Sequence, residues 1–421
     1  MKKHVWILNH YATNSYFNNG GRHYWFSRNL IKEGYKPLVF CADRRHNSID
    51  AVKIDHGKYY ESVNHDIPYV FIKTTASKKS KLSRVMNMIS FYKNILAMYK
   101  KYAKENGKPD IIIASSVHPL TLAAGIQIAK YFNIECICEI RDLWPESIVS
   151  YNLLSRKSII ARILYAGEKL LYKKANKLIF TFEGGADYIK DQKWDISQGG
   201  PIELNKVYYL NNGVDLDAFN YNKKLETLYD QDLENDNFFK VIYTGSIRKV
   251  NEVGYIVEVA KEVQSLGMND VKFIIYGEGD EKANLIKKVE KEKIKNIVFK
   301  GRVAKNKIPF VLSHSDVNIL HFKDNSIKKY GASLNKLFEY FASARPIISD
   351  CEFGYDLIKK YDCGVVIDKA TPEQLAREIL KIKNLDEKDY NLMCNNSSKL
   401  ARLYDFKKLT KGLITIIEEE K

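Results

Sequence analysis

Glu339 is the carboxylate with the most informative surroundings in this chain. It stands between Phe338 and Tyr340 in an apolar stretch that the sequence predicts as an amphipathic helix from Asn335 to about residue 344. The helix follows a loop of small residues and precedes an apolar strand expected at 346–349. A carboxylate in this setting suits the hydroxyl groups of a bound ligand. An ordinary surface glutamate on a helix is the alternative interpretation.

The first turn of this predicted helix offers free backbone N–H groups. A helix N-terminus at the carboxyl edge of a parallel sheet favours an anion, because the orphan N–H groups and the helix dipole both attract negative charge. A nucleotide whose phosphates met these amides would bring its ribose hydroxyls to Glu339. The residues at this start are Ser333, Leu334, Asn335 and Lys336.

Three successive strands expected in the second half of the chain end in glycine, and cations follow two of them. Close approach of the backbone to a base and its phosphates would explain all three glycine positions. The cations suit a diphosphate at the sheet edge, where donors and positive charge are needed together. A solvated basic loop remains the alternative. The glycines are Gly245, Gly277, Gly279 and Gly301, and the cations are Arg248, Lys249 and Arg302.

The first half of the chain also places polar residues at the ends of expected strands. Gly20 and Gly21 follow the first strand, where a tight turn or close approach to a ligand would each favour glycine. His118 follows an apolar strand. Asp142 lies in the Pro-bounded segment 139–147, which is dense in charged side chains and contains a tryptophan. We expect His118 and Asp142 to line the same wall of a cleft. A helix-capping role for His118 stays open.

The elements that must position these residues alternate regularly between strand and helix. This alternation predicts parallel sheets with right-handed crossovers, and two such series imply two doubly wound domains with a ligand site in the cleft between them. A polar, acidic segment at 220–238 has the composition of a linker, and a helical pattern at 400–420 is expected to return to the first domain. In the first half, strands are expected at 4–8, 37–41, 69–72, 110–114, 135–139, 178–182 and 207–210, and helices at 24–33, 120–132 and 157–174. In the second half, strands are expected at 240–244, 272–276, 297–300, 317–320, 346–349 and 364–367.

The composition is that of a soluble globular protein, with 45% hydrophobic and 28% charged residues among 421. No apolar run approaches the length of a membrane span and no signal peptide precedes the first strand, so we expect a cytoplasmic protein. Six scattered cysteines favour buried, reduced thiols. The net charge of +16 leaves nucleic acid, an anionic membrane surface and phosphate-bearing substrates as partners, besides coding bias.

Residues 78–108 combine nine cations with one acid, Glu105, and with apolar residues at helical spacing. This pattern is typical of a basic amphipathic helix. A core-facing helix with a solvated basic back explains it, and so does adsorption to an anionic membrane. Nucleic-acid binding is less favoured because no basic–aromatic recognition motif accompanies the charge.

The pair Asp215 and Asp217 has the spacing of a metal-binding motif in some nucleotide-sugar enzymes. It lies in a turn-like Asn-Asn-Gly-Val-Asp segment away from the expected phosphate edge, so we interpret it as a turn. No Cys/His metal spacing, Gly-x-Ser-x-Gly motif or P-loop is present. The sequence therefore predicts no metal site.

Taken together, these motifs resemble glycosyltransferase family 4 over nearly the full length of the chain. The resemblance rests on the Asp-Leu-Trp-Pro-Glu segment from Asp142 and the Asn-Lys-Leu-Phe-Glu-Tyr segment from Asn335, supported by the glycine positions and by Asn-Gly-Val-Asp at 212–215. The chain is most similar to the bacterial O-antigen and capsule subgroup that includes N-acetylfucosaminyl transferases. The resemblance implies the GT-B fold, with two Rossmann-like domains that face each other across a cleft.

The resemblance also implies a reaction and roles for residues. The reaction is retaining transfer from a UDP-sugar without an essential metal, to a lipid-linked or saccharide acceptor. Arg248 and Lys249 would neutralise the diphosphate, a purely electrostatic contribution, and Glu339 would bind the ribose. Gly20 and Gly21 would let the acceptor-side loop approach the donor. His118 and Asp142 would contact the donor sugar or the acceptor.

One departure from the family pattern concerns the sugar. The usual motif has two glutamates eight positions apart, but Gly331 stands eight residues before Glu339. The family's donor-sugar contacts therefore do not carry over to this chain. Arg248 and Lys249 also lie closer together than the usual Arg/Lys pair, so a single cation can suffice for the phosphate.

The expected protein is thus a peripheral glycosyltransferase at the inner face of the cell membrane. The expected domains are 1–219 for the acceptor, 220–402 for the nucleotide sugar, and 403–421 as a helix returning to the first domain. The transferred sugar is expected to be an N-acetylated hexose or deoxyhexose. A UDP-sugar 2-epimerase of the same fold and a non-catalytic basic membrane-binding protein are the alternatives.

Overall fold

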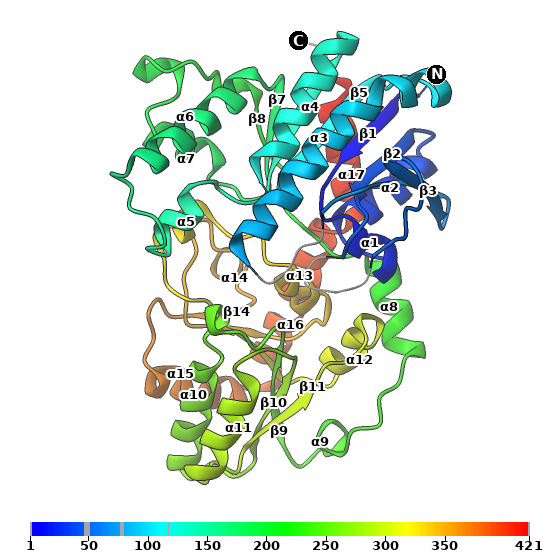
Figure 1. The fold of residues 1–421 in the computed structure, drawn as a ribbon. Helices are drawn as coiled ribbons and strands as arrows, with labels where there is room; N and C mark the ends of the chain where they lie inside the picture. Colours follow the sequence, from blue (N-terminus) through cyan, green and yellow to red (C-terminus); the bar gives the residue numbers. More distant parts are fainter. Residues whose placement is uncertain (1, 46–50, 76–79, 117, 420–421) are drawn as a thin grey trace. The chain divides into compact units, whose positions relative to one another are not determined.

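The computed structural model describes residues 2–45, 51–75, 80–116 and 118–419, and Figure 1 shows how their helices and strands succeed one another. The chain forms two compact units. The first consists of Met1–Asn211 with Leu409–Lys421, and the second of Asn212–Lys408. Each unit is built on one largely parallel sheet, so the α/β class predicted from the alternating pattern is confirmed. The division after Asn211 precedes the expected boundary at 219/220.

The first unit contains an eight-stranded sheet in the order β3-β4-β2-β1-β5-β6-β7-β8. Neighbouring strands are parallel except for the antiparallel pair of β3 and β4. The sequence did not predict β3, whose largely exposed residues lack an apolar pattern. The strands are β1 (His4–Leu8), β2 (Lys36–Ala42), β3 (Tyr59–Asn64), β4 (Ile67–Ile72), β5 (Ile111–Ser116), β6 (Glu135–Ile140), β7 (Lys177–Phe180) and β8 (Val207–Tyr209).

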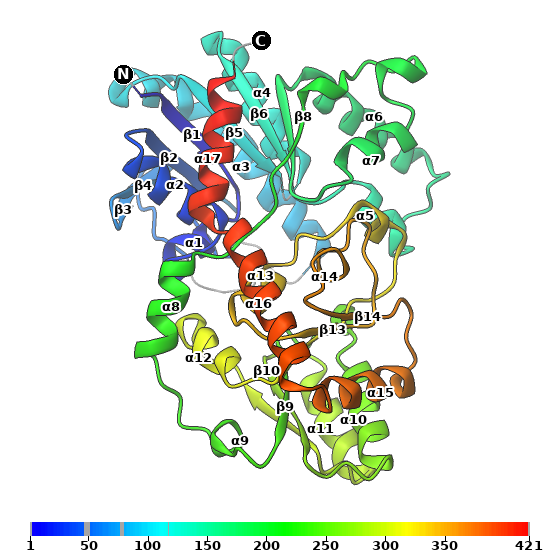
Figure 2. The same ribbon diagram turned by 180° about the vertical axis from the view of Figure 1, so that it is seen from behind.

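Helices cover both faces of this first sheet. Figure 1 shows α3 and α4 in front of it, and Figure 2 shows α17 on the other face. Helix α6 packs beside α4. The helices are α1 (Thr13–Asn18), α2 (Arg22–Lys32), α3 (Lys81–Asn106), α4 (Pro119–Phe132), α5 (Glu146–Ser150), α6 (Ile159–Lys174), α7 (Gly185–Asp191) and α17 (Phe406–Glu418).

The second unit contains a six-stranded, all-parallel sheet in the order β11-β10-β9-β12-β13-β14. One face packs on α10 and α15, and the other on α12, α13 and α16. The strands are β9 (Phe239–Thr244), β10 (Val271–Tyr276), β11 (Ile297–Gly301), β12 (Val317–Leu320), β13 (Ile347–Ser349) and β14 (Gly364–Val366). The helices are α8 (Leu216–Leu225), α9 (Gln231–Glu234), α10 (Gly254–Ser265), α11 (Lys282–Lys291), α12 (Ile308–Ser313), α13 (Asn335–Ala342), α14 (Leu357–Lys360), α15 (Pro372–Lys383) and α16 (Glu387–Leu403).

The acidic segment at 220–238 is not the structureless linker that its composition suggested. It contains the end of α8 and all of α9, and Asp230 is buried. The Asp230 carboxylate accepts hydrogen bonds from the Tyr276 hydroxyl at 2.5 Å and from the Lys300 ammonium at 2.6 Å. These contacts attach the segment to β10 and β11, because a buried carboxylate needs such partners.

The helical pattern at 400–420 forms two helices, because α16 ends at Leu403 and α17 begins at Phe406. The interpretation of Asp215 as a turn residue is wrong in detail. Asp215 is the N-cap of α8, and its carboxylate accepts a hydrogen bond from the backbone N–H of Ala218 at 2.8 Å.

Within the described part of the chain, no helix is long and apolar enough to cross a membrane. The six cysteines are free; five are buried and Cys394 is half-buried.

Candidate functional site

The site in the second unit is organised by α13, whose buried face sets the helix against the sheet. Leu337, Phe338, Tyr340 and Phe341 are buried on that face. The Tyr340 hydroxyl accepts a hydrogen bond from the backbone N–H of Thr244, at 3.0 Å, where β9 ends. This contact fixes the start of α13 at the carboxyl edge of the sheet. The helix begins at Asn335 as predicted, and it ends at Ala342.

The strand order reverses at β9, because β10 lies on one side of it and β12 on the other. Ligands of open α/β sheets bind at the carboxyl ends of the strands beside such a switch point. The loops after β9 and β12 and the start of α13 surround this point. Sequence reasoning placed its donor-binding residues in α13 and the loop before it, in the loops after β9, β10 and β11, and at Gly20 and Gly21 of the first unit.

Glu339 lies on the partly exposed face of α13. Its side chain is 23% exposed, and its nearest cation is the Lys305 ammonium at 3.9 Å. That separation leaves the carboxylate oxygens open to hydroxyl donors. Lys336 is directed differently: its ammonium donates a hydrogen bond to the Tyr243 hydroxyl at 3.0 Å and lies over the Tyr243 ring. Burial lowers the pKa of Lys336.

The glycines at the strand ends are required by contacts between loops. A Cβ on Gly277 would lie 1.8 Å from the carbonyl oxygen of Gly245, and one on Gly279 would lie 2.0 Å from that of Ile247. Backbone hydrogen bonds join the same loops, from Gly245 N to Tyr276 O and from Ile247 N to Glu278 O. This packing alone explains the glycines, whether or not a ligand also approaches them.

The cations predicted to bind the phosphates have exposed side chains in the loops that follow the strands. Arg248, Lys249 and Arg302 are exposed, and Arg248 precedes a short 3-10 turn at Lys249–Asn251. In the same loop, the hydroxyl of Ser246 donates a hydrogen bond to the side-chain oxygen of Asn251 at 3.0 Å.

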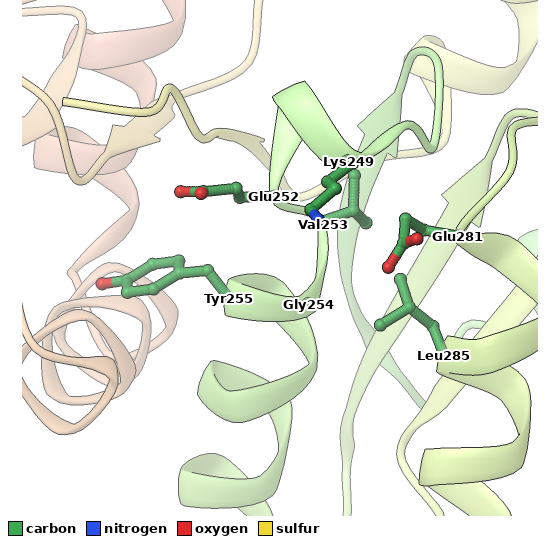
Figure 3. Close-up of a pocket in the computed structure, with 7 residues that line it drawn as sticks. All are labelled: Lys249, Glu252, Val253, Gly254, Tyr255, Glu281 and Leu285. Atoms are coloured by element: carbon green, nitrogen blue, oxygen red, sulfur yellow. The ribbon is translucent and has the colours of Figure 1, made fainter. Parts of the chain in front are cut away.

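Lys249 also lines a pocket of about 360 Å³ at the start of α10. Figure 3 shows Lys249 and Glu252 beside the turn that leads into the helix, with Tyr255 below them and Glu281 and Leu285 on the opposite side. Two carboxylates and a leucine make this pocket a poor phosphate site by itself. The pocket is relevant because it leaves the side chain of Lys249 accessible.

Sequence reasoning missed a buried His–Asp pair at the same edge. The Nδ1 atom of His321, which directly follows β12, is 2.6 Å from the Asp350 carboxylate, which directly follows β13. The Tyr255 ring stacks on the His321 ring, with centroids 4.7 Å apart. Both members of the pair are 8% exposed. A possible signal was a histidine and an aspartate that each directly follow an expected strand.

Four buried polar atoms near this edge have no hydrogen-bond partner among the described residues. They are Nε2 of His321, Oδ1 of Asp350, Oγ of Ser333 and Oγ1 of Thr244. Leaving such an atom unsatisfied costs about 1–3 kcal/mol. Native structures therefore satisfy them with water or a ligand. An imidazole nitrogen beside a carboxylate oxygen suits a hydroxyl group, which donates and accepts.

The first unit holds a fully satisfied carboxylate, Glu139, near the end of β6. Glu139 accepts hydrogen bonds from Arg22 at 2.6 Å, His23 at 3.0 Å and Ser115 at 2.6 Å. Burial alone would raise the pKa of Glu139, but Arg22 and His23 hold it well below its usual range. Arg22 and His23 follow Gly21, whose φ of 98° suits glycine. The Gly20–Gly21 turn thus delivers these two side chains to the sheet.

His118 lies at the end of a hydrogen-bonded chain. Asn87 donates through its Nδ2 to Thr74 and Thr75, so its oxygen accepts from Nε2 of His10. Nδ1 of His10 then accepts from Nε2 of His118 at 2.9 Å. Burial lowers the pKa of His118 to about 3, with a contribution from His10. The ring is therefore neutral, and its buried Nδ1 is an acceptor with no partner in the described residues.

Asp142 is exposed in the loop after β6, and His118 follows the neighbouring strand β5. The structure thus brings these two predicted residues to the same edge of the first sheet. No hydrogen bond within the described residues joins their side chains, and His118 is the N-cap residue of α4 without a side-chain capping bond. His118 therefore occupies the capping position that the alternative expected, but its side chain does not bond to the helix N-terminus. Across the described residues, no cluster of three potential metal ligands occurs.

Comparison with solved structures defines the architecture. The chain is similar to Anabaena Alr3699/HepE in complex with UDP and glucose, at 13% identity and a TM-score of 0.66, over 99% of this chain and 100% of that one. It is also similar to an E. coli structure described as trehalose-6-phosphate bound with UDP-2-fluoro glucose, at 8% identity and a TM-score of 0.73, over 99% of each chain. WaaG, a glycosyltransferase involved in lipopolysaccharide biosynthesis, matches at 14% identity and a TM-score of 0.64, over 99% of this chain and 100% of WaaG. The fold is the GT-B fold, as the sequence resemblance implied.

The family match concerns the second unit. Residues 226–399 match the model of the family described as glycosyl transferases group 1. This segment contains α13, the glycine-ended strands and the His321–Asp350 pair. This part of the second unit is therefore similar to glycosyl transferases group 1. No curated protein matches the chain in sequence.

Proposed function

We propose that this protein is a retaining glycosyltransferase that transfers a sugar from a UDP-sugar to a lipid-linked or saccharide acceptor. The observation that carries the proposal is the glycosyl transferases group 1 match over the unit that holds Glu339 and α13. Two of the similar structures named above contain UDP or UDP-2-fluoro glucose, which supports a uridine-diphosphate donor. The expected pathway is bacterial capsule or O-antigen synthesis, and the expected sugar is an N-acetylated hexose or deoxyhexose.

In this proposal the nucleotide lies at the carboxyl edge of the second sheet. Glu339 accepts hydrogen bonds from the ribose hydroxyls, since its carboxylate has one distant cation, Lys305, as a competitor. The backbone N–H groups at 333–336 face the phosphates. The packed glycines Gly245, Gly277 and Gly279 keep the loops close together at this edge, where the base and the diphosphate would bind.

The leaving group is the uridine diphosphate, whose negative charge grows as the glycosidic bond breaks. Arg248 or Lys249 stabilises this charge electrostatically, and Arg302 adds positive charge beside the neighbouring strand end. Exposed cations with long, flexible side chains suit this role because they can follow the phosphate as it departs. No metal is needed in the proposal, so we expect turnover to persist in EDTA.

The sugar and the acceptor are assigned to three other groups. Neutral His118 offers its unpartnered Nδ1 as an acceptor for a sugar hydroxyl, and Asp142 is exposed at the same edge of the first sheet. His321 and Asp350 offer one nitrogen and one oxygen to a hydroxyl group. We assign this pair to the donor, where Gly331 stands in place of the family's first glutamate.

The proposal is tested by incubating the purified protein with a panel of UDP-sugars and measuring UDP release and binding. The expected result is selective binding of one donor and acceptor-dependent release of UDP. Absence of binding or release with every donor would refute the transferase. Release of UDP together with free sugar, without an acceptor, would indicate a hydrolysing 2-epimerase instead.

The proposed location is the inner face of the cell membrane, with α3 as the predicted contact. In α3, Leu82, Val85 and Met86 are exposed in the first turns, while Phe91 and Ile95 are buried further along. Most of this helix is therefore the core-facing alternative with a basic back. Lys78 and Lys79 lie outside the described residues, so the prediction for them stands on the sequence alone.

A further inference from the structure

Helix α6 presents an apolar face to solvent. The exposed fractions of Ile159, Ile160 and Ile163 are 75%, 62% and 65%, and that of Leu170 is 49%. Leu153, in the loop before the helix, is 70% exposed. Singly exposed apolar residues are common on protein surfaces, but a cluster of this kind marks an interaction site.

This exposed face is not the face that holds the helix on the protein. Ala161, Glu168 and Tyr172 are buried at helical spacing, and α6 packs beside α4 on that side. Glu168 accepts hydrogen bonds from Tyr172 and Tyr188, both at 2.7 Å. The first turns of α6 thus expose three isoleucines, whereas a surface helix normally carries mainly polar residues on its solvent side.

The exposed charges that α6 itself carries are all positive. The helix contains four cations, Arg162, Lys169, Lys173 and Lys174, and a single acid, Glu168, which is buried. Lys157 precedes the helix and is exposed. An apolar strip bordered by cations, without an exposed carboxylate on the helix, complements a surface that is apolar inside and anionic at its rim.

We propose that the exposed face of α6 docks on an anionic lipid bilayer. The three isoleucines enter the boundary between headgroups and acyl chains, and the cations contact the lipid phosphates. A protein partner is the less favoured occupant, because lysine is depleted at protein–protein interfaces. The α6 surface would act beside or instead of α3, whose exposed apolar residues are confined to its first turns.

This inference goes beyond the donor chemistry and does not depend on it. The residues of the α6 face belong to the first unit and are absent from the proposed nucleotide site. A protein that releases UDP without binding vesicles refutes only the α6 surface. A protein that binds vesicles through α6 without using any UDP-sugar refutes only the transferase.

The test is co-sedimentation of the full chain with phosphatidylcholine vesicles, with and without phosphatidylglycerol. The variant carries Ile159→Ser, Ile160→Ser and Ile163→Ser. A matched control carries Tyr221→Ser, Leu225→Ser and Tyr229→Ser, which remove three residues of similar exposure, 64%, 61% and 79%, from the second unit. We expect the α6 variant to bind anionic vesicles about tenfold or more weakly, and the control to bind like the parent protein.

A second variant tests the charge. Replacing Arg162, Lys173 and Lys174 by glutamine should weaken binding to anionic vesicles and reduce its dependence on salt, with little effect on neutral vesicles. Unchanged sedimentation of the isoleucine variant would overturn the proposal. So would a dimer of the parent protein that the isoleucine variant converts to a monomer, since the face would then be a protein interface. Circular dichroism checks that each variant is folded.

Discussion

Two buried carboxylates, one in each sheet, differ in how many of their partners the protein itself supplies. Glu139, near the end of β6, has hydrogen bonds from an arginine, a histidine and a serine. Asp350, directly after β13, is paired with His321 through one oxygen, and its other oxygen has no partner among the described residues. The Glu139 network is closed, in the sense that the protein supplies hydrogen-bond partners for the carboxylate. The His321–Asp350 pair is open, in the sense that it keeps polar atoms without a partner among the described residues.

The difference separates a structural role from a binding role. A closed network stabilises the fold. Removal of one partner leaves the other groups buried without a hydrogen bond, so that the full cost of their desolvation is felt. An open pair gives the folded state little, because its free atoms are unsatisfied until something binds. Changes at Glu139 should therefore act on stability, and changes at Asp350 should act on ligand binding.

The largest expected effect is that of Glu139→Ala. This change leaves Arg22 buried without its carboxylate, and it should lower the free energy of unfolding by about 3–5 kcal/mol. Denaturant unfolding monitored by circular dichroism measures this loss. Glu278→Ala is the control, because Glu278 forms an exposed pair with Lys282, and it should cost less than about 1 kcal/mol. Equal losses in both variants would contradict the structural role of the Glu139 network.

Acid should weaken the first sheet through His118. The pKa of His118 is about 3 in the folded protein, below its unfolded value of about 6.5, so the unfolded chain binds more protons at acidic pH. This contribution to stability is complete above pH ~6.5 and is lost toward pH ~3, by up to about 1.4 kcal/mol per pH unit. Unfolding curves at pH 7 and pH 5 should show the loss, and His118→Asn should reduce it. The same slope in both proteins would contradict the assignment.

Glu339→Ala tests the nucleotide part of the open edge. It should weaken UDP binding by about tenfold, the equivalent of about 1.4 kcal/mol, because the ribose hydroxyls lose a charged acceptor. Titration calorimetry with UDP measures the change. Glu378→Ala, on α15, is a suitable control and should leave the affinity unchanged. An unaltered affinity of the Glu339 variant would refute the ribose contact.

The smallest effect on stability is expected from the double change His321→Phe and Asp350→Ala. Replacing both members of a buried polar pair with apolar groups is often nearly neutral, so unfolding should shift by less than about 1 kcal/mol. Binding of the preferred UDP-sugar should weaken several-fold, while binding of UDP should change little. Loss of UDP and UDP-sugar binding to the same extent would place the pair at the nucleotide rather than the sugar.

Most strands were predictable from the sequence because they are short apolar runs whose residues are buried on both faces of the sheet. β1 and β12 have the bounds that their apolar residues suggest, and α13 begins at Asn335 as expected. β3 was not predictable, since it is an edge strand with exposed residues. The prediction of a linker at 220–238 was wrong because an acidic residue such as Asp230 is typical of a linker in the sequence. Only the fold brings Tyr276 and Lys300 to its carboxylate.

The site shows the same limit. Single residues at strand ends, such as His118 and Asp142, can be recognised along the chain because each element has a polar end. Contacts between residues far apart in the sequence cannot be recognised in this way. Arg22 and Glu139 are 117 residues apart, and their contact exists only once β6 and the start of α2 are in place. The exposure of the α6 isoleucines is also invisible in sequence, because their pattern equals that of a buried helix.

The last helix has a consequence for the order of synthesis and folding. Lys177 on β7 is fully buried, and its ammonium donates hydrogen bonds to the carbonyl oxygens of Ile416 and Glu419, besides pairing with Glu135. The second unit is one continuous stretch of chain, whereas the first is completed only by residues 409–421. During synthesis, β7 is therefore made long before the carbonyl groups that complete the hydrogen bonding of its lysine, because 239 residues separate Lys177 from Ile416. A purified fragment that ends at Lys408 should contain a folded second unit and an incomplete first one.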